Sequence, residues 1–251
     1  MQLVLLTALG VGGATVIGSV IGFFFRNISH RFNDIILAFA SGVMLSAAVT
    51  GLILESLEYE GNFTPLITVA GIFSGAVIIH LFDKIVPHMH RLAGIKEGEN
   101  VSKKEQISKV LLFVTAIAIH NFPEGIAAGV GFGTGDVSQA LTIALAIALQ
   151  NIPEGMIIIG PMLSAGISPW RTFVTATATG VIEVIGTLIG YFATTISTAI
   201  LPFALAFAGG TMLYVISDEM IPETHSHGNS RGVTYSLLLG FCTMLILDFY
   251  I

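Results

Sequence analysis

The chain has 251 residues, of which 54% are hydrophobic and only 10% are charged, and its formal net charge is −6. Soluble domains usually carry about 25% charged residues, so this composition excludes a water-soluble globular protein and favours a protein embedded in lipid. The single cysteine, Cys242, excludes an internal disulfide and a zinc site built from several thiolates, and the acidic balance gives no indication of nucleic-acid binding.

Long apolar stretches predict an all-α membrane protein with eight transmembrane helices, because a helix needs about 20 apolar residues to cross the hydrocarbon core. In chain order the predicted spans cover about 3–25, 34–56, 65–87, 108–131, 139–162, 170–193, 199–221 and 233–251. The longest polar stretch, about 88–107, is predicted to be a cytoplasmic loop rather than a second domain. Residues 1–251 would then form a single transmembrane domain.

The distribution of charge agrees with eight spans. All ten lysines and arginines fall on one side of such a chain, whereas the other side carries Glu55, Glu58, Glu60 and Asp136. Since cytoplasmic loops carry an excess of lysine and arginine, we expect the basic side to be cytoplasmic. Both termini would lie outside, and we expect a plasma or inner cell membrane.

The fourth and fifth predicted spans share a motif near their centres. The segments 116–125, AIAIHNFPEG, and 146–155, AIALQNIPEG, are identical at seven of ten positions. Because consecutive spans run antiparallel, the same motif read in opposite directions predicts a local twofold relation in the membrane plane. Inverted repeats with ligand groups at mid-membrane depth are typical of transporters.

The spacing within the motifs predicts a metal site. His120 and Glu124 are four residues apart, as are Gln150 and Glu154, so each pair shares one helix face. The prolines are expected to kink both helices and to direct oxygen atoms at a common point. Imidazole, amide and carboxylate ligands suit a divalent transition metal such as Zn²⁺, Fe²⁺ or Mn²⁺, and two carboxylates neutralise one such ion.

Other spans add candidate ligands. Glu183 lies near the centre of the sixth span, and Met44 lies near the centre of the second, where a thioether could bind metal. Methionine more often fills apolar gaps than binds metal, and Glu183 could instead pair with a neighbouring helix. Asp218, Glu219 and Glu223 follow toward the cytoplasmic end of the seventh span and are candidates for an exit path.

These residues resemble the ZIP (zinc/iron-regulated transporter-like) family. The two motifs, Glu183 and the ending Asp218-Glu219 to Pro222-Glu223 carry the resemblance, and Gln150 with the run 201–225 is most similar to the GufA-type branch. The resemblance covers essentially the whole chain. It implies eight spans with both termini outside and uptake of a divalent metal, first of all zinc, toward the cytoplasm, with Fe²⁺, Mn²⁺ or Cd²⁺ as other substrates.

The resemblance also implies which residues bind metal. A first ion would be held by His120, Glu124, Gln150 and Glu154, with Met44 as a further ligand. A second position would use Asn121, Asn151 and Glu183, with Glu124 and Glu154 bridging. Some family members carry an acid at the position of Asn151, which leaves the occupancy of the second position open.

Two other classes of function remain open at the level of sequence. A metal-selective cation channel could use the same ligands, and an intramembrane metal hydrolase could use His120 and the glutamates to activate water. No HExxH or GxxxxGK[ST] motif is present, so neither a metalloprotease of that type nor direct nucleotide use is expected. We therefore expect that the chain is not an enzyme. A homodimer is one candidate for its assembly.

Overall fold

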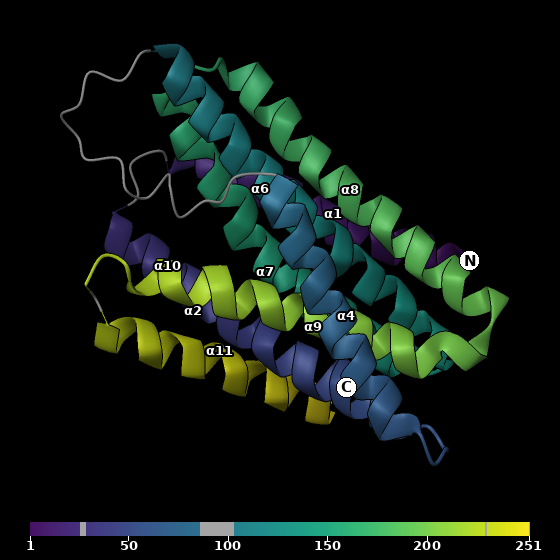
Figure 1. Cartoon of the computed structure of the whole chain (residues 1–251). Helices are drawn as coiled ribbons and strands as arrows, with labels where there is room; N and C mark the ends of the chain where they lie inside the picture. The colour runs from purple at the N-terminus through teal and green to yellow at the C-terminus, as the bar shows by residue number, and fades with distance from the viewer. Residues whose placement is uncertain (26–28, 86–102, 229, 251) are drawn as a thin grey trace.

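The computed structural model describes residues 1–25, 29–85, 103–228 and 230–250, and these residues form helices joined by short connections (Figure 1). The all-α fold class is therefore confirmed. In chain order the elements are α1 (Gln2–Phe24), α2 (His30–Ser46), η1 (Ala47–Leu54), α3 (Glu55–Leu57), α4 (Thr64–Ile85), α6 (Lys103–Gly131), η2 (Phe132–Thr134), α7 (Val137–Ser164), α8 (Pro169–Ile196), η3 (Thr198–Ile200), α9 (Leu201–Val215), η4 (Ile216–Met220), α10 (Ile221–His225) and α11 (Ser230–Tyr250).

The predicted spans correspond to these helices. Within the described residues, seven stretches are long and apolar enough to cross a membrane: Gln2–Phe24, Arg31–Leu57, Thr64–Leu81, Val137–Ser164, Pro169–Ile196, Leu201–His225 and Arg231–Tyr250. The 29-residue α6 takes the place of the fourth predicted span. Both chain ends lie away from α10 (Figure 1), as an even number of antiparallel spans requires.

The predicted loop at 88–107 is wrong at its C-terminal end. Residues 103–107 already belong to α6, because Lys103-Lys104-Glu105-Gln106 are good helix formers that extend a helix beyond its apolar part. The rest of that loop, with His88 and His90, lies outside the described residues.

Two of the spans are interrupted by π-helical segments. The second predicted span is made of α2, η1 and α3, and the seventh is made of α9, η4 and α10. In a π segment each backbone hydrogen bond spans five residues instead of four, which widens the helix, and such segments are frequent at functional sites. The segment η4 carries Asp218 and Glu219, so the structure gives these residues a local backbone that the apolar pattern did not predict.

The inverted repeat is larger than the motif pair on α6 and α7. Segment 37–45, LAFASGVML, matches 205–213, LAFAGGTML, at seven of nine positions, and 16–24 matches 184–192 at six of nine positions. Both matches have the same offset of 168 residues, which relates α1 to α8 and α2 to α9. The two π segments fall on the related helices α2 and α9.

The packing of the helices obeys the same relation. The helix α1 lies against α7 and α8, α6 lies against α8 and α7, α4 lies against α9, and α2 lies against α11. Exchanging α1 with α8, α2 with α9, α4 with α11 and α6 with α7 converts each of these pairs into another pair of the set. The fold is therefore a twofold bundle with α6 and α7 at its centre, and it relates the two motifs to each other.

Glycines bring the backbones of the central helices into direct contact. Gly12 on α1 and Gly180 on α8 are separated by the offset of the repeat, and a Cβ on either would overlap the carbonyl oxygen of the other. The motif glycines behave likewise, since a Cβ on Gly125 would overlap the carbonyl of Glu183 and one on Gly155 would overlap that of Thr15. Small residues allow this close approach in lipid, and it places Thr15 and Glu183 beside the motifs.

Replacing Asp136 with alanine is expected to destabilise the start of α7 by about 1 kcal/mol. The Oδ1 atom of Asp136 accepts hydrogen bonds from the backbone N–H groups of Ser138 at 2.8 Å and Gln139 at 3.1 Å. Asp136→Asn retains the capping oxygen and is the matched control. The check is the apparent melting temperature in detergent; equal losses in both variants would contradict a capping role.

Candidate metal site

The polar residues of both motifs are buried side by side at the centre of the bundle. His120, Asn121 and Glu124 come from α6, and Gln150, Asn151 and Glu154 come from the adjacent α7; none is more than 7% exposed. Carboxylates at such positions are costly unless a partner is present. Their burial together therefore makes these residues a candidate functional site.

Several of these polar groups have no hydrogen-bond partner within the described residues. Both amide atoms of Asn121, the Oδ1 atom of Asn151 and the Oε2 atom of Glu154 are of this kind. The carboxylate of Glu124 is also close enough to those of Glu154 and Glu183 for electrostatic repulsion. Buried polar groups are normally hydrogen-bonded, so this arrangement fits a site that a cation completes.

His120 contacts a residue that the sequence placed only on the exit path. Its Nε2 atom lies 3.1 Å from Oε1 of Glu219 on η4, and Glu219 is 3% exposed. The contact joins α6 to the seventh span, so Glu219 belongs to the buried site itself. The i,i+4 spacing of His120 and Glu124 gave no indication of this contact, because it depends on how two distant helices pack.

The ligand residues do not form a finished cage. Among the described residues, no three His, Cys, Asp or Glu side chains come close enough together to hold one metal ion. Coordination of an ion at the motif pair would therefore require the amide oxygens of the site or a movement of side chains. The contact between His120 and Glu219 is one that such a movement would have to open.

An acid-lined pocket leads from the motif pair toward one end of the bundle. We call this the basic end, because Arg31, Arg171 and Arg231 lie there, and the opposite end the acidic end, because Glu55, Glu58, Glu60 and Asp136 lie there. The pocket is lined by Leu37, Ile117, His120, Glu154, Ile157, Val215, Glu219, Met220 and Glu223. Of the three predicted exit residues, Glu219 and Glu223 line it, whereas Asp218 is exposed and does not.

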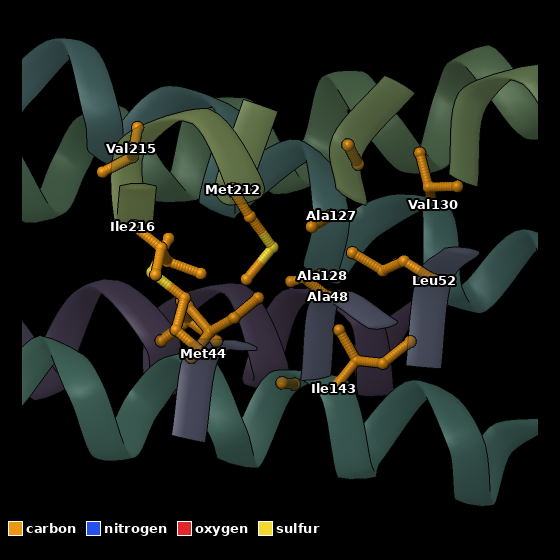
Figure 2. Close-up of a cluster of buried hydrophobic side chains, with 14 of the residues drawn as sticks. Met44, Ala48, Leu52, Ala127, Ala128, Val130, Ile143, Met212, Val215 and Ile216 are labelled. Atoms are coloured by element: carbon orange, nitrogen blue, oxygen red, sulfur yellow. The ribbon is translucent and has the colours of Figure 1, made fainter. Parts of the chain in front are cut away.

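Apolar side chains fill the other half of the same interhelical space. Leu52, Ala127, Ala128, Val130 and Ile143 pack there, between the motifs and the acidic end (Figure 2). This apolar packing lies on the acidic side of the motif residues, whereas the pocket extends from His120 and Glu154 to Glu223.

Met44 belongs to that apolar cluster. Its side chain is fully buried and is grouped with Met212, Val215 and Ile216 (Figure 2). Met44 and Met212 are equivalent residues of the sequence repeat, since they are 168 positions apart. The structure thus places Met44 in packing contacts, the more common role of a buried methionine.

Glu183 lies at the second predicted position together with Asn151. The Nδ2 atom of Asn151 donates to Oε2 of Glu183 at 2.8 Å, and the hydroxyl of Thr15 on α1 donates to Oε1 at 3.1 Å. Thr15 was missed from the sequence because a lone threonine in an apolar span carries no signal by itself. The sequence repeat supplies such a signal, because its offset of 168 residues pairs Thr15 with Glu183.

Three of the other histidines make contacts outside the motifs. Nδ1 of His80 lies 3.0 Å from the Tyr214 hydroxyl, and Nδ1 of His225 lies 3.0 Å from the carbonyl oxygen of Ile221. Nδ1 of His227 lies 3.1 Å from Oδ1 of Asp34. These are contacts within the protein near the basic end.

Comparison with known proteins gives consistent matches. Residues 83–248 match the model of the family described as ZIP Zinc transporter. The chain is 40% identical over 190 residues to "Zinc transporter GufA" of Myxococcus xanthus, covering 76% of this chain and 73% of that protein. It is 34% identical over 241 residues to "Zinc transporter ZIPB" of Bordetella bronchiseptica, covering 94% and 77%. It is also 34% identical over 248 residues to "Zinc transporter ZupT" of Chlorobaculum parvum, covering 94% and 92%.

Proposed function

Because this chain belongs to the ZIP family, in its GufA-type branch, we propose that it transports zinc across the membrane from the acidic end to the basic end. The proposed path passes through a site between α6 and α7. The chain is an integral multi-pass membrane protein and a transporter rather than an enzyme. We place the basic end in the cytoplasm and both termini outside, in a plasma or inner membrane.

The observation that carries this proposal is the contrast between the two sides of the motif pair. Unpartnered buried ligands meet an acid-lined pocket toward the basic end and a packed apolar cluster toward the acidic end. A site with a pocket on one side and dense packing on the other fits one state of a carrier with alternating access. A selective channel would need a continuous polar path.

We assign the first ion to His120, Glu124, Gln150 and Glu154, with Met44 as a candidate further ligand. The carboxylates of Glu124 and Glu154 balance the charge of one divalent ion and replace part of its water shell. His120 exchanges its contact with Glu219 for the ion. Release then proceeds past Glu219 and Glu223 along the pocket, and the exposed Asp218 stays a candidate for a later part of the path.

Zinc uptake into reconstituted vesicles tests the proposal. Vesicles with the protein are expected to show saturable uptake that a zinc indicator in the lumen reports, and empty vesicles are expected to show none. Competition with Fe²⁺, Mn²⁺ and Cd²⁺ ranks the substrates, since sites of nitrogen and oxygen ligands overlap across these metals. Current through single proteins in a planar bilayer, without saturable exchange, would favour the channel instead.

Glu219→Gln is expected to slow zinc release while the protein stays folded. Glutamine retains the size of the side chain and can still contact His120, but it has no charge to accept the ion from the motif ligands. We expect maximal uptake to fall by about tenfold, with a smaller change in the half-saturating zinc concentration. Ser217→Ala, on the same π segment, is the control; equal uptake by both variants would exclude Glu219 from the path.

A further inference from the structure

Glu183 already has a donor on each of its oxygens. The hydroxyl of Thr15 and the amide of Asn151 donate to its two oxygen atoms at 3.1 and 2.8 Å. The three residues come from α1, α7 and α8, and none of them is exposed. Two neutral donors compensate part of the cost of burying this carboxylate without a metal ion.

The orientation of the Asn151 amide is fixed by the backbone of α1. Its Nδ2 atom donates both to Glu183 and, at 3.1 Å, to the carbonyl oxygen of Val11. A carbonyl oxygen can only accept, so the NH₂ group must face Val11. Turning the amide over would place Oδ1 against two acceptors and would lose both hydrogen bonds.

The fixed amide leaves no ligand atom between Asn151 and Glu183. The hydrogens of Nδ2 point at the carboxylate there, and a cation binds an asparagine through its oxygen. The Oδ1 atom faces away from Glu183 and has no hydrogen-bond partner within the described residues. Asn151 is therefore arranged to offer its oxygen to an ion held by the motif pair, and Glu183 is arranged to orient Asn151.

We propose that this chain holds one ion at the motif pair rather than two, with the Asn151–Glu183 hydrogen bond occupying the place of a second ion and Thr15 acting as a positioning residue. The inference rests on the proposed function, since it concerns the same site. Glu124 and Glu154 suffice for one divalent charge. An aspartate at position 151 would instead remove the amide donor and place two carboxylates beside the Val11 carbonyl, an environment that favours a second cation.

Zinc stoichiometry of the purified, metal-depleted full chain tests the proposal, measured by titration calorimetry and by metal analysis after desalting. The wild type is expected to bind one zinc ion, and Asn151→Asp is expected to bind two. Glu183→Gln is expected to keep one ion with affinity within about tenfold of the wild type, because glutamine can accept from Asn151 and donate to Thr15. Two ions in the wild type, one of them lost in Glu183→Gln, would overturn the proposal.

Thr15 provides the second arm of the test. Thr15→Val has nearly the same shape but no donor, and it is expected to weaken zinc binding by about three- to tenfold at unchanged stoichiometry. Thr15→Ser restores the donor and is expected to restore affinity. Equal affinity in Thr15→Val and the wild type would overturn the positioning role. If the wild type neither takes up nor binds zinc, the proposed function itself is refuted.

Discussion

Glu124→Ala is expected to abolish zinc uptake and at the same time to stabilise the metal-free protein. The carboxylate is 1% exposed and lies close enough to the carboxylates of Glu154 and Glu183 for electrostatic repulsion. Charged side chains at the centre of a span cost about 2.5–3.5 kcal/mol on insertion scales, and alanine removes that cost. Loss of a proposed ligand is expected to lower uptake by at least about 100-fold, beyond the range seen for residues that only support a ligand.

Two measurements separate these effects. The apparent melting temperature without metal is expected to rise in Glu124→Ala, whereas the further rise that zinc gives the wild type should disappear. Glu154→Ala is expected to lose uptake to the same extent, and Glu60→Ala, at an exposed acid, should behave as the wild type. Unchanged zinc flux in both Glu124→Ala and Glu154→Ala would show that the ion takes another route.

Gly12→Ala and Gly13→Ala are expected to have opposite effects on stability, although the residues are neighbours on α1. A Cβ on Gly12 would overlap the carbonyl oxygen of Gly180 and lie 2.9 Å from Cγ2 of Val184, whereas a Cβ on Gly13 meets no atom within 4 Å. The backbone of α8 at Gly180 cannot shift as easily as a side chain can change its rotamer. Gly12→Ala should therefore cost about 1–3 kcal/mol or more, and Gly13→Ala should gain up to about 1 kcal/mol from its better helix propensity.

The Gly12 substitution should also impair zinc binding. The contact with Gly180 lies one helical turn from Thr15 and Glu183, so separating α1 from α8 lengthens the hydrogen bond between them. Melting temperature in detergent and zinc affinity measure the two effects, with Gly13→Ala as the matched control. Similar melting temperatures for the two variants would contradict the close helix contact.

The sequence predicted the spans and the ligand-bearing motifs because both are local properties. Twenty apolar residues define a span, and i,i+4 spacing places His120 with Glu124 on one face of α6 whatever surrounds it. The contact of His120 with Glu219 could not be predicted in this way, since it joins residues that are 99 positions apart through the packing of α6 and η4. Residue patterns predict neither a π segment nor the direction in which a side chain turns.

Other parts of the site were within reach of the sequence but were not read from it. The offset of 168 residues pairs Thr15 with Glu183 and Met44 with Met212, and it could have indicated both the repeat and the place of Thr15. The contact of Asn151 with the Val11 carbonyl is different. It involves a backbone carbonyl, a group that every residue type has, so only the packing of α1 against α7 reveals it.

The repeat has a thermodynamic consequence for the two faces of the protein. A perfectly twofold carrier would present the same affinity and the same empty state to both sides of the membrane. This chain departs from the symmetry along the proposed ion path, because His120 is equivalent to Gln150 and Glu219 is equivalent to Gly51. Gln150 and Gly51 cannot form the ion pair that His120 can form with Glu219, so we expect this contact to favour the form of the empty protein that contains it over the symmetric form. We therefore expect the unloaded carrier to rest in that form, and return to the acidic side to limit its turnover.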